Sequence, residues 1–144
     1  MTHPDLGYYT RKEKVIGGSG DFITSPELTP VFGELCGIWA IYQWQQMGKP
    51  EKVSLVELGP GKGTLMKDML RIAKKFPDFF NAVEIHLIER SKLMMEQQKQ
   101  TLYNFNKEIS WHADVELVPD QPMLLIGQEY LDALPVHQFQ YTKK

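Results

Sequence analysis

The sequence has little of what marks metal-binding, disulfide-bonded and membrane proteins. Its 144 residues include one cysteine, Cys36, so no disulfide framework and no cysteine-based zinc site is expected, and a reducing compartment fits. No apolar run approaches the ~20 residues that cross a bilayer. The formal net charge of −2 gives no basic excess for a nucleic-acid partner. We therefore expect an ordinary globular chain of one domain with no membrane span.

The N-terminus carries no recognisable targeting signal. It lacks the apolar core of a secretory signal, and Asp5 and Glu13 stand among its basic residues, which is unlike a mitochondrial transit peptide. No targeting segment is visible, and the amino-acid composition does not indicate a cellular compartment.

The stretch VSLVELGPGKGTL, residues 53–65, organises the chain. Its first six residues are too apolar for a surface strand and are typical of a strand buried on both faces of a parallel sheet. Glycines follow in the spacing G-x-G-x-G, and an apolar helical pattern opens at Leu65. Strand, glycine turn and helix predict the first half of a nucleotide-binding βαβ unit, because glycine lets the backbone turn sharply and approach a ligand.

The spacing of these glycines favours a ligand without a pyrophosphate. The dinucleotide fingerprint is G-x-G-x-x-G, and here Thr64 stands where its third glycine would be. Pro60 also removes one N–H from the loop and makes it a poorer phosphate nest. S-adenosylmethionine suits the loop better than a dinucleotide, so a dinucleotide-dependent oxidoreductase is the less favoured alternative.

Three blocks of sequence resemble one family. VELGPGKGTL, with GDFITSPE before it and GQEYLDALPV after it, resembles the class I methyltransferases that include the mitochondrial arginine methyltransferase required for complex I assembly. The blocks occur in the family's order. The resemblance implies a Rossmann-like class I α/β fold, S-adenosylmethionine as cofactor, arginine N-methylation of a protein, namely a complex I subunit, and a mitochondrial matrix location.

Residues 1–24 read as an N-terminal arm, and residues 25–144 as a partial methyltransferase domain, the cofactor-binding half. Ser25 is placed to cap a helix with Pro26 at its first position. The apolar series of this helix predicts its buried face: Leu28, Val31, Phe32, Leu35, Trp39 and Tyr42. The resemblance places Thr24 and Ser25 beside the cofactor, whereas the residue pattern alone requires only helix capping.

The expected cofactor-binding residues begin with Glu57, Gly59, Gly61 and Gly63 in the glycine block. A second strand is predicted near residues 83–88, and Glu89 at its end can accept hydrogen bonds from both ribose hydroxyls. The alternative for Glu89 is a solvated acid paired with Arg90.

A short strand near residues 109–111 is followed by Asp114. The resemblance places an adenine contact there, and the alternative is a capping or solvated aspartate. The resemblance places a further cofactor contact at Gln128. Many relatives have Asn at this position, and Gln keeps the side-chain amide.

The predicted strand 123–126 leads into Glu129 and Asp132, the expected catalytic pair. Deprotonating a guanidinium at pH 7 costs on the order of 7 kcal/mol, so arginine methylation needs carboxylates that hold it and receive its proton. The alternative is that Asp132 only caps a helix turn and Glu129 acts alone.

A fifth strand is predicted to begin at residues 136–141, whereas the class I fold has seven strands. The chain therefore reads as truncated after the first strands of the sheet. A non-catalytic cofactor-binding or assembly module remains an alternative to an active enzyme.

Overall fold

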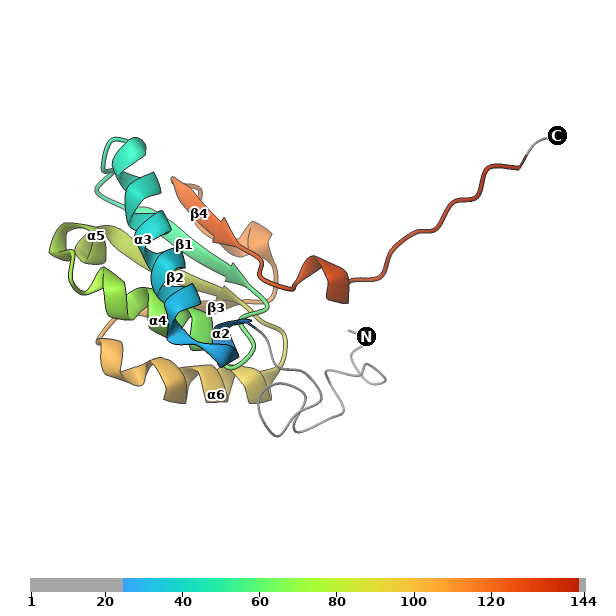
Figure 1. Cartoon of the computed structure of the whole chain (residues 1–144), viewed down its shortest axis with the longest axis horizontal. Helices are drawn as coiled ribbons and strands as arrows, with labels where there is room; N and C mark the ends of the chain where they lie inside the picture. Colours follow the sequence, from blue (N-terminus) through green and yellow to red (C-terminus); the bar gives the residue numbers. More distant parts are fainter. Residues whose placement is uncertain (1–24, 143–144) are drawn as a thin grey trace.

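The computed structural model describes residues 25–142, without the side chains of Ser25 and Glu27, as a parallel sheet with helices packed against it (Figure 1). The four strands are β1 (Val53–Leu58), β2 (Val83–Ile88), β3 (Ile109–His112) and β4 (Met123–Ile126), in the order β3-β2-β1-β4. The helices are α2 (Ser25–Leu28), α3 (Pro30–Gln46), α4 (Thr64–Ala73), α5 (Pro77–Ala82) and α6 (Lys92–Leu102). Single 3-10 turns are η1 (Tyr103–Phe105), η2 (Val115–Leu117) and η3 (Leu131–Ala133). The Rossmann-like α/β fold is confirmed.

The central position of β1 brings the functional segments together. β1 pairs in parallel with β2 on one side and with β4 on the other, so that Val56 lies opposite both His86 and Leu125. β3 pairs in parallel with the far side of β2. The carboxyl ends of all four strands therefore meet at one edge of the sheet, which is where open α/β sheets bind ligands.

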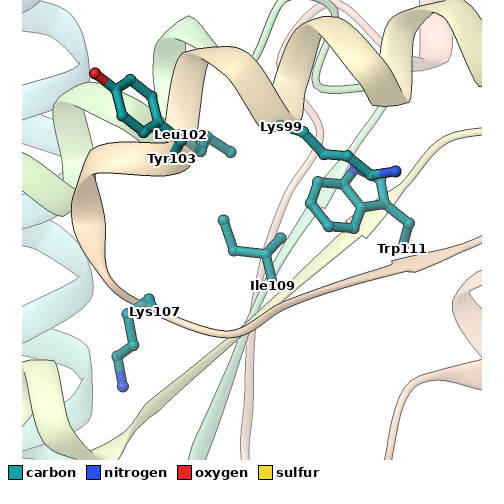
Figure 2. Close-up of a pocket in the computed structure, with 6 residues that line it drawn as sticks. All are labelled: Lys99, Leu102, Tyr103, Lys107, Ile109 and Trp111. Atoms are coloured by element: carbon teal, nitrogen blue, oxygen red, sulfur yellow. The ribbon is translucent and has the colours of Figure 1, made fainter.

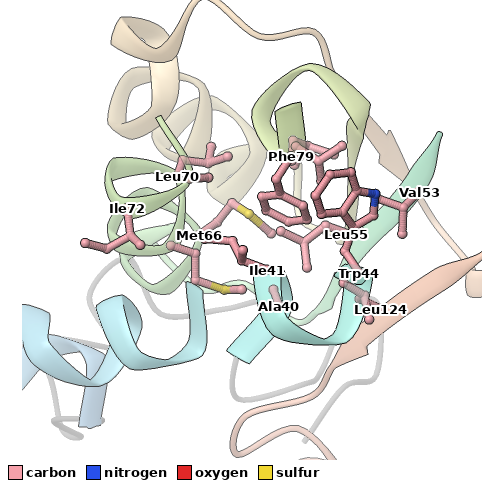
Figure 3. Close-up of a cluster of buried hydrophobic side chains, with 14 of the residues drawn as sticks. Ala40, Ile41, Trp44, Val53, Leu55, Met66, Leu70, Ile72, Phe79 and Leu124 are labelled. Atoms are coloured by element: carbon pink, nitrogen blue, oxygen red, sulfur yellow. The ribbon is translucent and has the colours of Figure 1, made fainter. Parts of the chain in front are cut away.

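The main core lies between one face of the sheet and helices α3 and α4 (Figure 3). Leu55, Met66 and Leu70 are at most 1% exposed in it. Trp44 packs its ring 5.6 Å from that of Phe79 and donates its indole N–H to the carbonyl of Pro50 at 2.9 Å. This core fixes α4, and with it the glycine loop from which α4 starts.

The predicted helix from Ser25 is two helices, and its predicted buried face is wrong. Thr29 interrupts it and caps α3, where its hydroxyl accepts from the Val31 N–H at 3.3 Å and Pro30 takes the first position. Five of the six residues of the predicted face are exposed: Leu28, Val31, Leu35, Trp39 and Tyr42; only Phe32 packs against the core.

Small residues form the buried face of α3 instead. Gly33 and Gly37 face α4, and a Cβ built on Gly33 would lie 2.5 Å from the Cβ of Asp68. The absent side chains therefore let the two helix backbones approach closely. Since Glu34 is the only charged residue of α3, the helix is apolar on both sides, and periodicity alone could not choose between the two faces.

The predicted strand at 136–141 is not formed. Residues 134–142 run away from the sheet as an extended segment (Figure 1), with Phe139 94% exposed. An isolated extended segment gains no ladder hydrogen bonds, so β-forming residues alone do not make it a strand. Within residues 25–142, no helix is both long and apolar enough to cross a membrane.

Candidate functional site

The loop between β1 and α4 is built on left-handed glycines. Gly59, Gly61 and Gly63 have φ of 61°, 53° and 80°, which L side chains rarely adopt. The Gly59 N–H donates to the carbonyl of Ile88 at 3.1 Å, and the Gly63 N–H donates to the carbonyl of Pro60 at 2.8 Å. The loop is therefore tied to the end of β2 and closes tightly on itself before α4 begins.

Glu89 follows β2 directly, and its carboxylate is held by three donors. Its Oε1 accepts from the backbone N–H groups of Arg90 at 2.9 Å and Ser91 at 2.8 Å, and its Oε2 accepts from Gln98 Nε2 at 3.2 Å. A carboxylate has about four acceptor positions, so one on Oε2 is left for a ligand. The side chain of Arg90 bonds Asp114 and the carbonyl of Ala113 rather than Glu89.

Glu57 lies behind the glycine loop on the core face of β1. It is 4% exposed, and burial raises its pKa to about 8, although a hydrogen bond from the Met66 backbone opposes the rise. Its Oε2 has no hydrogen-bond partner among the described residues. Buried polar atoms are normally satisfied, so this oxygen is a polar group that a bound ligand would complete, as a donor where the carboxyl is protonated and as an acceptor where it is not.

Asp114 follows β3 and caps η2. Its Oδ1 accepts from the Glu116 N–H at 3.4 Å, and its Oδ2 lies 3.4 Å from the guanidinium of Arg90. The structure therefore shows the capping role, and contact with adenine remains a prediction.

The segment after β4 folds back over the glycine loop. A Cβ built on Gly59 would lie 2.6 Å from Cδ2 of Tyr130, so the tyrosine ring covers this glycine. Glu129 is exposed with a left-handed φ of 50°, a conformation that costs energy outside glycine. Gln128 donates to Glu129 Oε1 at 3.4 Å. Asp132 lies within η3, whose N-cap is Tyr130, so it does not cap that turn.

The last two predicted residues precede α3. Thr24 lies outside the described residues, and only the backbone of Ser25, in α2, is described. α2 packs against α3 and α4 at the same edge as the glycine loop (Figure 1). The structure thus gathers the glycine loop, Glu57, Glu89 and the segment after β4, and it leaves the roles of Thr24 and Ser25 as predictions.

Two residues of the site were missed by reasoning from sequence. Tyr130 stands between predicted residues, and only its packing on Gly59 distinguishes it. Gln98 is one of three glutamines in α6 and is the only one fully buried. Nothing in the local pattern marks it, because a polar residue in a helix is ordinarily expected on the exposed side.

A separate hollow lies between α6 and the outer edge of β3 (Figure 2). Its volume is about 170 Å³, and it is lined by Lys99, Leu102, Tyr103, Lys107, Ile109 and Trp111. Lys99 lies over the indole of Trp111, with its Nζ 5.6 Å from the ring centroid. No predicted site residue lines this hollow, so we do not assign the cofactor to it. The described residues contain no cluster of three metal-ligating side chains.

Comparison with known proteins agrees with this geometry. The model of a family described as putative S-adenosyl-L-methionine-dependent methyltransferase matches residues 35–144. Protein arginine methyltransferase NDUFAF7, mitochondrial, from Xenopus tropicalis is 38% identical over 165 residues, which cover 99% of this chain and 38% of that protein. The Drosophila melanogaster homologue is 37% identical over 160 residues, covering 97% and 36%. The chain thus spans just over a third of the length of these mitochondrial relatives.

A solved structure shares the fold. A protein from Burkholderia thailandensis, crystallised with S-adenosyl-homocysteine, superposes with a TM-score of 0.67 at 19% identity, over 88% of this chain and 33% of that one. On the family match, which covers most of its length, the chain belongs to the family of putative S-adenosyl-L-methionine-dependent methyltransferases.

Proposed function

We propose that residues 25–144 are the cofactor-binding half of a protein arginine methyltransferase and that residues 1–24 are an arm preceding it. The observation that supports this most is the pairing of a left-handed glycine loop with a fixed carboxylate at the next strand end. Gln98 bonds both of them, at 2.7 Å to the Gly61 carbonyl and 3.2 Å to Glu89. An acid at the end of β2 beside such a loop is suited to a ribose.

The residues fit S-adenosylmethionine, which supplies a methyl group activated by its sulfonium. Gly59, Gly61 and Gly63 are the proposed loop contacts, and at Gly59 and Gly63 these would be made by the backbone, because Tyr130 and Gln98 occupy the sides where a Cβ would stand. The open acceptor position of Glu89 would take a ribose hydroxyl. Glu57 offers an unpartnered oxygen. With its pKa raised to about 8 it is mostly protonated near neutral pH and can donate a hydrogen bond, whereas the carboxylate of Glu89 is the acidic group suited to a cationic ligand. Asp114, Gln128, Thr24 and Ser25 complete the proposed contacts.

For the methyl acceptor, Glu129 and Asp132 are the proposed catalytic residues. Both are exposed on the segment that packs over the glycine loop, where an incoming side chain can reach them. They would hold an arginine guanidinium in line with the methyl group and receive its proton. The relatives are named protein arginine methyltransferases, and we propose a complex I subunit in the mitochondrial matrix as the substrate.

Methyl transfer to peptides tests this function. Labelled S-adenosylmethionine is incubated with the chain and with matched peptides that carry either one arginine or one lysine. Transfer to the arginine peptide, lowered at least tenfold in Glu129→Gln and preserved in the exposed-surface control Glu116→Gln, would support the proposal. Cofactor binding without transfer to either peptide would instead favour a non-catalytic binding or assembly module.

A further inference from the structure

The buried amide of Gln98 joins several parts of the candidate site. Gln98 is 0% exposed, although it belongs to a helix whose other polar residues are mostly at the surface. Its Nε2 donates to the Gly61 carbonyl at 2.7 Å and to Glu89 Oε2 at 3.2 Å. Its Oε1 accepts from the indole N–H of Trp111 at 2.8 Å.

These contacts fix the amide in one orientation. Turning it by 180° would place its oxygen against a carbonyl and a carboxylate, and its NH₂ against the indole N–H of Trp111. Both N–H groups of the amide are already used, one on the loop and one on Glu89, so the side chain cannot turn without breaking all three bonds.

The aliphatic part of Gln98 also contacts the loop. A Cβ built on Gly63 would lie 3.5 Å from Cγ and 3.6 Å from Cα of Gln98, so the loop rests on this side chain at Gly63 as well as at Gly61. Trp111, from β3, holds the other end of the amide. One side chain therefore links α6, β3, the glycine loop and the acid after β2.

We propose that Gln98 is a positioning residue that sets the spacing between the glycine loop and the ribose-binding carboxylate of Glu89, and thereby the affinity for the cofactor. The inference rests on the proposed cofactor site. Gln98 uses one acceptor position of Glu89 Oε2 and so directs the remaining one toward the ligand. Without the amide, Glu89 keeps its backbone donors on Oε1 but loses the hydrogen bond that ties Oε2 to the side chain holding the loop.

Calorimetric titration of the 144-residue chain with S-adenosyl-homocysteine tests this role. Gln98→Met keeps the length of the side chain and removes its three hydrogen bonds, and Gln100→Met makes the same change at an exposed position of α6. We expect Kd to rise about tenfold or more in Gln98→Met, because small misplacements of binding groups have large effects, and to change less than about twofold in Gln100→Met.

A double-mutant cycle with Glu89→Gln distinguishes a positioning role of Gln98 that acts through Glu89 from a general contribution to the stability of the fold. If Gln98 acts through Glu89, the loss from Gln98→Met shrinks below about threefold in the Glu89→Gln background. An unchanged Kd in Gln98→Met, or the same loss in both backgrounds, would overturn the inference, whatever happens to the melting temperature.

Amide hydrogen exchange of residues 59–63 in the ligand-free chain gives a readout that does not need the cofactor. We expect faster exchange in Gln98→Met, or in Trp111→Phe if the first variant does not fold, since Trp111→Phe removes only the outer anchor of the amide. Unchanged exchange would contradict the positioning role. Failure of the unmodified chain to bind S-adenosyl-homocysteine, with loop exchange still dependent on Gln98, would contradict the proposed function alone.

Discussion

At the scale of single residues, the candidate site depends on backbone angles that only glycine adopts easily and on one acid that water does not reach. Gly59 meets both a conformational and a steric limit, because its φ is 61° and the ring of Tyr130 fills the space where a Cβ would be. Gly48, at the end of α3, has a φ of 84° with no atom within 4 Å of a built Cβ. Comparing the same substitution at Gly48 and at Gly59 therefore separates the cost of backbone strain from the cost of a steric clash.

Alanine at these two positions should have unequal effects. Gly48→Ala meets only the left-handed strain, so we expect a loss of about 1 kcal/mol in the free energy of unfolding. Gly59→Ala adds a clash with Tyr130, which costs about 1–3 kcal/mol more. Urea denaturation of both variants measures the difference, and equal losses would show that Tyr130 does not pack on Gly59 in solution.

The buried carboxyl of Glu57 should make stability depend on pH. Burial raises its pKa in the folded chain from 4.5 to about 8, so between these values the folded state holds a proton that the unfolded state has lost. The contribution of Glu57 to the free energy of unfolding is therefore fully present below about pH 4.5. It falls as the pH rises toward about 8, by on the order of 1 kcal/mol per pH unit at most.

Glu57→Gln removes that dependence. The free energy of unfolding, measured by urea denaturation, should be higher for Glu57→Gln than for the unmodified chain, and this difference should be larger at pH 8 than at pH 5. A difference between the two proteins that stays constant over this range would contradict the assignment of a raised pKa to Glu57.

At the scale of elements, the strands were predictable and the orientation of α3 was not. Residues 53–58, 83–88 and 123–126 form strands as their apolar runs indicate. The first two are buried on both faces, which gives a distinctive composition, whereas in the third Leu125 is 44% exposed. α3 has apolar residues all round, and the close approach to α4 through Gly33 and Gly37 decided which side is buried. That choice depends on the partner helix, which a local pattern does not contain.

Alanine substitutions on the two sides of α3 test this orientation. Ile41 is 4% exposed and Leu35 is 62% exposed. Ile41→Ala should cost about 2–5 kcal/mol of unfolding free energy, and Leu35→Ala less than about 0.5 kcal/mol. A comparable cost at both positions would show that the outer face of α3 is also buried in solution.

The same distinction applies to the site. The positions of the glycine loop and of Glu89 were predictable because they follow from spacing along a βαβ unit, and their roles toward the cofactor stay predictions. Gln98 was not, since its role arises from contacts with residues 37 and 9 positions away, and with Trp111, 13 positions away. The positions of Glu129 and Asp132 after β4 followed from the sequence, whereas the packing of Tyr130 on Gly59 did not.

At the scale of the whole molecule, residues 25–142 form a four-stranded parallel sheet, and the glycine loop, Glu89 and the segment carrying Glu129 follow strand ends on one edge of it. The chain belongs to the family of putative S-adenosyl-L-methionine-dependent methyltransferases, and it spans just over a third of the length of the mitochondrial relatives. The proposed cofactor is therefore the first point to test: this edge of the sheet should bind S-adenosylmethionine rather than a dinucleotide.

Calorimetric titration with S-adenosylmethionine, and separately with NAD, tests that claim most directly. We predict micromolar binding of S-adenosylmethionine alone, weakened about 10- to 100-fold in Glu89→Ala because a charge-assisted hydrogen bond to the ribose is worth roughly 1.5–3 kcal/mol. Binding of NAD with similar affinity, or no binding of S-adenosylmethionine by a folded sample, would contradict the account.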